Sequence, residues 1–168
     1  MYERILIPTD GSEGTDTVVE EAASLVDPEN VHVHVLYVID HRALLPLGED
    51  EQRTVGETLQ ERGEAAVESV SEAITEALPD AEVTTMVAQG LPARQILAYV
   101  QEKGVDAVFL GSHGQTMRKQ AIGSTTERVV RGINHIPETS VIIIPIGRPE
   151  ERPGPEEAIT EQAKEMFQ

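Results

Sequence analysis

The chain has 168 residues without a cysteine, and 13 Lys and Arg against 30 Asp and Glu give it a net charge of −17. This length suits one domain around one core, and the missing cysteines exclude disulfides, thiolate nucleophiles and cysteine-based metal centres. So negative a surface repels nucleic acid and anionic membranes, and no apolar run approaches the ~20 residues that span a bilayer.

The acidic charge balance has two interpretations. A high-salt cytoplasm favours acidic surfaces, because salt screens their self-repulsion; the alternative is an acidic mesophilic protein. We favour the halophilic interpretation on charge alone. The N-terminus enters a strand-like run without the layout of a signal peptide. The lack of cysteines fits a cytoplasmic protein, and that location is expected.

Strand and helix patterns alternate along the first half of the chain. Residues 2–9 (YERILIPT) and 31–39 (VHVHVLYVI) predict buried strands. Apolar residues at helical spacing predict a helix between them, with Ser12 as its N-cap. Residues 40–53 are expected to form a loop, and the apolar stripe that follows predicts a long helix.

The second half continues the alternation, with strands expected at residues 81–87, 105–110 and 140–146. Pro92 suits the first position of a helix, and Gly104 suits its left-handed end. Another helix is expected from Ser124 to about residue 133. Residues 1–147 then form one domain, and residues 148–168 form an acidic, proline-containing tail with a possible short helix.

The complete pattern predicts an α/β fold, namely a doubly wound, open, five-stranded parallel sheet with helices on both faces. Sheets of this kind commonly place the first strand centrally. Ligands then bind outside the carboxyl ends of the strands, where the strand order reverses. The loops after the first and fourth strands should therefore lie at one ligand-binding edge.

Both loops carry residues suited to an anionic ligand. Glycines allow the backbone to approach a phosphate, and N–H groups at a helix start bind anions. Asp10 would accept a hydrogen bond from a ribose hydroxyl or approach a phosphate-bound Mg²⁺. Taken alone, residues 10–12 are better explained as a turn and a helix cap, and Gly111 and Gly114 as turn glycines. The common position of both loops at one edge of the sheet favours the ligand site. The expected site residues of the two loops are Pro8, Thr9 and Asp10, then Gly111, Ser112, His113 and Gly114, and finally Gly123, Ser124, Thr125 and Thr126.

The combination of PTDGS at residues 8–12, GSHG at 111–114 and GST at 123–125 resembles the universal stress protein family over nearly the whole chain up to Ile146. The resemblance implies a Rossmann-like, adenine nucleotide alpha hydrolase-like fold that binds ATP, AMP or a related adenine nucleotide, with backbone at Val38 bonding the adenine. The family's ATP-binding pattern is Gly-x2-Gly-x9-Gly-Ser/Thr, whereas eight residues separate Gly114 from Gly123 here. Arg118 and Lys119 in this shorter loop would add local positive charge.

Two functions of different class follow from the resemblance. In the first, the nucleotide acts as a stress-response switch by ordering the loop at residues 115–122, which changes a surface that a protein partner reads. In the second, the function resides in a homodimer and does not require a nucleotide. The two copies pair through the last strand, which begins at Ser140 and ends at Ile146, and family members are similar in dimerising through this strand. The shorter loop favours the second function, and Asp10 with Ser124 and Thr125 favours the first. A small hydrolase or flavin-type binding domain of the same architecture is a third alternative.

No catalytic set is evident, because the chain has neither a Gly-x-Ser-x-Gly elbow nor a Walker loop with its lysine. At most, slow ATP hydrolysis is expected. His32 and His34 share one strand face, as metal ligands often do, but no third ligand is evident, so packed or hydrogen-bonded histidines are the favoured interpretation.

Overall fold

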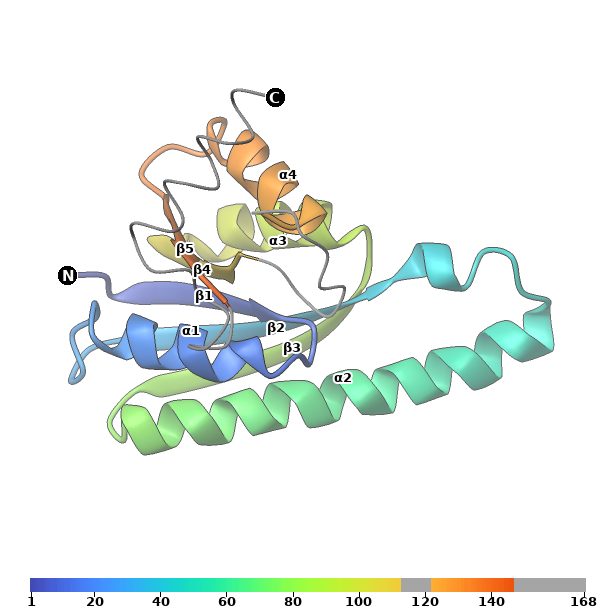
Figure 1. The fold of residues 1–168 in the computed structure, drawn as a ribbon, viewed down its shortest axis with the longest axis horizontal. Helices are drawn as coiled ribbons and strands as arrows, with labels where there is room; N and C mark the ends of the chain where they lie inside the picture. Colours follow the sequence, from blue (N-terminus) through green and yellow to red (C-terminus); the bar gives the residue numbers. More distant parts are fainter. Residues whose placement is uncertain (113–121, 147–168) are drawn as a thin grey trace, which may run out of the picture.

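The structure, a computed structural model, describes residues 1–112 and 122–146. Its five strands form one parallel sheet in the order β3-β2-β1-β4-β5, with β1 at the centre (Figure 1). The strands are β1 Arg4–Thr9, β2 His32–Asp40, β3 Glu82–Gly90, β4 Ala107–Gly111 and β5 Ser140–Ile144. The predicted doubly wound parallel sheet is confirmed, including its central first strand.

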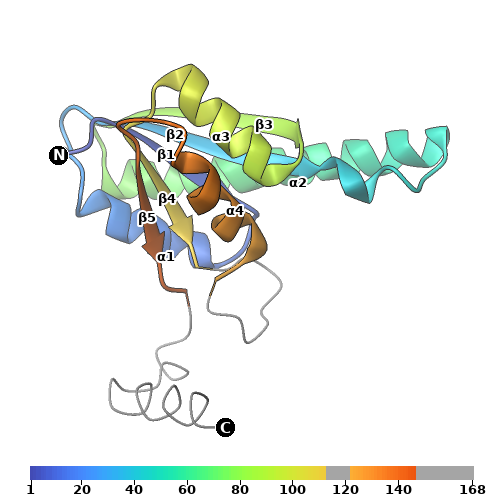
Figure 2. The same ribbon diagram turned by 90° about the horizontal axis from the view of Figure 1, so that it is seen from above.

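Helices cover both faces of this sheet. In Figure 1, α1 and α2 lie on one face, and α3 and α4 lie on the other. Figure 2 shows the same molecule from above, with β5 and β3 at opposite sides of the sheet. The helices are α1 Gly14–Ala23, α2 Glu49–Ala77, α3 Pro92–Lys103 and α4 Ser124–Ile133, and a short 3₁₀ helix, His41–Ala43, follows β2.

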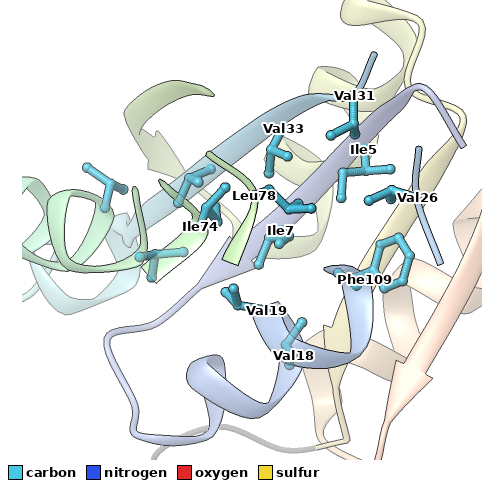
Figure 3. Close-up of a cluster of buried hydrophobic side chains, with 14 of the residues drawn as sticks. Ile5, Ile7, Val18, Val19, Val26, Val31, Val33, Ile74, Leu78 and Phe109 are labelled. Carbon is cyan, nitrogen blue, oxygen red and sulfur yellow. The ribbon is translucent and has the colours of Figure 1, made fainter. Parts of the chain in front are cut away.

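Side chains of β1 alternate between two apolar clusters, one on each face. Ile5 and Ile7 pack with Phe109 beneath α1 and α2 (Figure 3), whereas Leu6 packs beneath α3 and α4. All of these side chains are almost completely buried. A strand that is buried on both faces must be apolar at every position, which is why the central strands appear as continuous apolar runs in the sequence.

Helix boundaries depart from the sequence pattern at two places. The predicted loop at residues 40–53 ends early, because α2 already begins at Glu49. Its first turn is acidic, which suits the positive end of the helix dipole, and Gly48 N–H donates to the Glu51 carboxylate over 3.4 Å. The predicted N-cap Ser12 is wrong by one residue, since Glu13 precedes the first turn of α1.

Strand β3 also extends three residues beyond its predicted end at Val87. It pairs with β2 without interruption, from His32 opposite Glu82 to Asp40 opposite Gly90. This long partner keeps the less β-prone end of β3 extended, which local propensity does not reveal.

Two glycines of α2 provide a test of its packing against the sheet. A Cβ added at Gly63 would lie 2.7 Å from Tyr37 Cδ1 and 3.0 Å from Val87 Cγ1, whereas a Cβ at Gly56 would meet nothing within 4 Å. We expect Gly63→Ala to lower the free energy of unfolding by about 1–3 kcal/mol through overpacking. Gly56→Ala should raise it by about 0.5–1 kcal/mol through helix propensity.

Urea denaturation followed by circular dichroism measures both glycine variants. Gly56→Ala is the matched control, because it makes the same chemical change in the same helix. If both variants gain stability equally, the close approach of α2 to Tyr37 does not exist in solution.

Candidate functional site

A cavity of about 360 Å³ opens at the carboxyl ends of the central strands. The strand order reverses between β1 and β4, because α1 leaves β1 on one face and α4 follows β4 on the other. The diverging connections leave a crevice, which is the usual ligand position in this architecture. Its volume falls within the roughly 300–1,000 Å³ of small-molecule sites.

Most of the site residues predicted from sequence share this cavity. Ser112 is not part of the lining, and His113, Gly114, Arg118 and Lys119 lie outside the described residues. The predicted residues that line the cavity are Pro8, Thr9, Asp10, Val38, Gly111, Gly123, Ser124, Thr125 and Thr126.

The loop after β1 is held by two polar side chains. Ser12 N–H donates to Asp10 Oδ1 over 3.0 Å, and Gly11 N–H donates to Thr9 Oγ1 over 3.1 Å. The Thr9 and Thr15 hydroxyls also hydrogen-bond each other at 3.1 Å, away from solvent. Gly11 adopts φ of 79°, a left-handed conformation that favours glycine. The aspartate and threonine therefore shape the wall of the cavity as well as lining it.

Ser112 joins three elements behind the cavity. Its N–H donates to Ile144 O over 2.9 Å, its hydroxyl accepts from Ile146 N–H over 3.0 Å, and its carbonyl accepts from Gly123 N–H over 2.6 Å. The residue is buried. In the described structure Ser112 thus fixes the ends of β4 and β5 against the start of α4.

The start of α4 is the part of the cavity best suited to an anion. Its N-cap, Gly123, has no side chain with which to cap the first turn, and Ser124, Thr125 and Thr126 bring that turn to the lining. N–H groups of a first helical turn have no partner within the helix, and the helix dipole adds positive potential there. Thr126 Oγ1 donates to Gly111 O over 3.0 Å, which ties this turn to the end of β4.

The floor of the cavity is apolar, and Val38 is the member of it that was predicted from the sequence. Leu36 lies two residues earlier on β2 and therefore on the same face as Val38, a period-two signal that was available. Ile96 reaches the floor from α3, which only tertiary packing reveals. The additional apolar lining residues are Val18, Leu36, Ile96, Leu110 and Ile146.

Asp10 is the sole ionisable side chain among the described lining residues. A polyanionic ligand would therefore meet one negative charge beside the neutral N–H groups of α4. A divalent cation between Asp10 and a phosphate would remove this repulsion, and carboxylate oxygen is the donor type that Mg²⁺ prefers. The Asp10 carboxylate and the first turn of α4 are thus the described lining groups that could approach a cation and an anion, respectively.

The histidines of β2 lie apart from the cavity lining. The rings of His32 and His34 stack at 4.1 Å, His32 Nε2 hydrogen-bonds Thr84 Oγ1 at 2.8 Å, and His34 Nδ1 hydrogen-bonds the Tyr99 hydroxyl at 2.8 Å. These contacts agree with packed, hydrogen-bonded histidines. Among residues 1–112 and 122–146, no cluster of three or more His, Asp and Glu side chains has the arrangement of a metal site.

Fold and cavity together define a doubly wound α/β protein with a ligand-sized hollow at its switch point. Residues 1–135 match the universal stress protein family, and the chain belongs to that family. Universal stress protein MJ0531 of Methanocaldococcus jannaschii is 28% identical over 133 residues, which cover 78% of this chain and 77% of the relative. Universal stress protein MJ0577 of the same organism is 27% identical over 150 residues, with coverages of 80% and 91%.

Solved structures show the same architecture. The structure of MJ0577 aligns with a TM-score of 0.75 at 24% identity, covering 88% of this chain and 99% of that one. A universal stress protein in complex with cAMP aligns with a TM-score of 0.58 at 17% identity, with coverages of 85% and 96%. At these identities the two structures show the common fold alone. No helix in the described part of the chain is long and apolar enough to cross a membrane.

Proposed function

We propose that this chain binds ATP or a related adenine nucleotide as a regulatory switch in a stress response. The observation that carries the proposal is the cavity itself, in which an apolar floor lies beside the first turn of α4. Such a cavity offers one surface to a planar base and another to phosphates. The membership of the chain in the universal stress protein family supplies the stress context.

Pairing of β2 supports a role for Val38 in binding the base. The register of β1 with β2 ends at Thr9 opposite Tyr37, whereas the register of β2 with β3 continues through Val38 opposite Ala88. Among the described residues, the pairing of β2 with β1 therefore stops one residue before Val38. The edge of an adenine could hydrogen-bond there while its face contacts Ile96 and Leu36, in agreement with the role that the family resemblance implies for Val38.

Phosphates would lie toward α4. The N–H groups of Ser124 and Thr125 would bind phosphate oxygens, and Mg²⁺ would bridge the phosphates to Asp10. A structure of this fold holds cAMP, which supports an adenine nucleotide as the class of ligand to test.

Mass spectrometry of the small molecules released when the purified protein is denatured, followed by calorimetric titration with ATP–Mg²⁺, tests the proposal. AMP and cAMP are titrated in parallel, at low and at high salt. We expect an adenine nucleotide to be recovered or to saturate one site per chain. A folded protein that binds none of the three at either salt concentration would contradict the proposal.

The second candidate function is a nucleotide-independent homodimer, and the position of β5 favours it. This strand forms one edge of the sheet, and Val141, Ile142 and Ile143 are only partly buried there. An apolar edge strand readily pairs with the same strand of a second copy around a twofold axis. The dimer is compatible with nucleotide binding, because β5 and the cavity use different surfaces apart from the segment that reaches Ile146.

Lysine substitutions test this dimer. We expect Val141→Lys or Ile143→Lys to give monomers in light scattering after size exclusion, because each places a charge in an apolar interface. Met86→Lys on β3, at the opposite edge, is the matched control and should leave the dimer intact. A dimer that persists in both β5 variants would exclude this interface.

A further inference from the structure

The outer edge of β3 is long and lacks the usual protection. This strand has nine residues, Glu82–Gly90, and pairs with β2 alone among the described residues. Exposed edges in native sheets are normally shortened, bulged or protected by proline and lysine, because they attract further strands. β3 contains neither proline nor lysine, and its uninterrupted register with β2 leaves no bulge.

A groove of about 460 Å³ runs beside this edge, between β3 and α2. Helix α2 contacts β3 and follows its length in Figures 1 and 2. Val83 and Val87 pack toward α2, so the alternation of the strand directs Thr85 to the same side. Because Thr85 is short and exposed, the space between it and Val67 of α2 stays open.

The groove is acidic on its helical wall. Glu64 and Glu68 both line it and are exposed, and residues four apart share one face of a helix. None of the lining residues is Lys or Arg. Met86 is part of the groove lining at the edge, but strand alternation directs its side chain to the other face of β3. This large apolar side chain is 45% exposed.

We propose that this edge receives an extended, basic segment of a partner protein, which adds to β3 as a sixth strand. Backbone hydrogen bonds to β3 would supply affinity, and the alternating side chains would supply specificity. Every second side chain of the added strand faces α2, and these side chains are Lys or Arg directed toward Glu64 and Glu68. The remaining side chains of the added strand lie beside Met86 and are apolar.

Charge also argues against a second copy of this chain as the occupant. Edge-to-edge pairing of two β3 strands would bring Glu64 and Glu68 of both copies to the same side, where like charges repel. The strand at the opposite edge, β5, instead presents the partly buried apolar side chains of Val141, Ile142 and Ile143. The β3 edge is therefore suited to a foreign basic strand, and the β5 edge to self-association.

Fluorescence anisotropy with a labelled heptapeptide of alternating lysine and valine tests the proposal on the full-length protein. Because any cationic peptide is attracted to a chain of charge −17, two further peptides carry the same lysines with N-methyl groups on one or the other alternate set of residues. We expect one methylated peptide to bind like the parent and the other to lose at least about tenfold in affinity, since only one set of N–H groups faces β3. Equal binding of all three would overturn strand addition.

Two charge variants locate the binding site. Glu64→Lys/Glu68→Lys should weaken binding of the parent peptide at least about tenfold. Glu20→Lys/Glu21→Lys on α1 is the matched control, because it changes the net charge equally at exposed positions outside the groove. Equal losses in the two variants, or no loss in either, would overturn the assignment to this groove. Parent peptide that does not bind at all would overturn the proposal outright.

Discussion

Val38→Trp is expected to lower the affinity for ATP–Mg²⁺ by at least about 100-fold, equivalent to roughly 2.7 kcal/mol, while the protein stays folded. Val38 lines the floor of the cavity and is only partly buried, so an indole can occupy the space that the proposed adenine would fill. Isothermal titration calorimetry measures the affinity, and circular dichroism with thermal unfolding verifies the fold.

Val55→Trp is the control for this substitution. Val55 is 36% exposed on α2 and does not line the cavity, so the same chemical change there should leave nucleotide affinity unaltered. If Val38→Trp binds ATP as tightly as the unmodified protein, the nucleotide is held elsewhere and the proposed orientation of the base is wrong. Equal losses in both variants would indicate a general loss of structure.

The acidic surface makes the salt dependence of this binding informative. The net charge of −17 repels a polyanion at long range, whereas the N–H groups of α4 attract it only locally. Salt screens the long-range repulsion more strongly than close contacts. The low-salt and high-salt titrations therefore distinguish two cases. If the affinity is similar at both salt concentrations, close contacts determine binding; if the affinity rises with salt, binding depends on screening of the acidic surface.

Much of the fold was predictable because local and long-range signals agree. The apolar run through Ile5 and Ile7 indicated a strand buried on both faces, and the structure places it at the centre of the sheet. Pro92 at the start of α3 and Gly104, with φ of 60° after its end, mark helix boundaries by backbone chemistry alone. Such features act within a few residues and can be recognised without knowledge of the partners.

Boundaries that depend on tertiary partners could not be predicted in the same way. The last residues of β3 are extended because β2 continues beside them as far as Asp40. There the local composition favoured a loop, and the neighbouring strand determined the outcome. The early start of α2 at Glu49 is different, because its acidic first turn after Gly48 is a local signal that the loop prediction did not use.

The candidate site likewise has one part that was predictable from the sequence and one part that was not. Its polar residues could be predicted, because they belong to glycine and hydroxyl motifs that follow two strands. The carboxyl ends of parallel strands lie at the same edge of the sheet, so these motifs are expected to lie close together. Its apolar floor includes Val18 and Ile96 from two helices, and those two residues are indistinguishable from core residues in the sequence. Ser112 carries a second structural feature that the motif did not reveal, because its hydrogen bonds join β4, β5 and the start of α4.

Outside the cavity, His34 gives the fold a defined sensitivity to acid. It is 4% exposed, and burial lowers the pKa of its imidazole to about 4 from the ordinary 6.5, with smaller contributions from the positive charges of His32, Arg4 and Lys103. Tyr99 hydrogen-bonds its Nδ1, whereas its Nε2 is buried without a hydrogen-bond partner in the structure. A protonated His34 would thus be buried among cations with one N–H unsatisfied.

The direction of the pH effect follows from proton linkage. Between pH 6.5 and about 4, the unfolded chain binds a proton at His34 and the folded protein does not, so acid favours unfolding in that window. The contribution of His34 to stability is complete above pH 6.5 and falls as the pH is lowered toward 4. A pKa difference of this size corresponds to roughly 3 kcal/mol over the full window.

We therefore expect His34→Gln, which cannot titrate but can still hydrogen-bond Tyr99, to remove roughly 2 kcal/mol of the stability lost between about pH 7 and about pH 5. Urea denaturation at both pH values gives the free energy of unfolding. His135→Gln, at an exposed position after α4, is the matched control and should lose as much stability as the unmodified protein. All three proteins have the same carboxylates, so the contributions of these groups cancel in the comparison. A His34→Gln variant with an unchanged acid loss would mean that His34 reaches solvent and accepts its proton without unfolding.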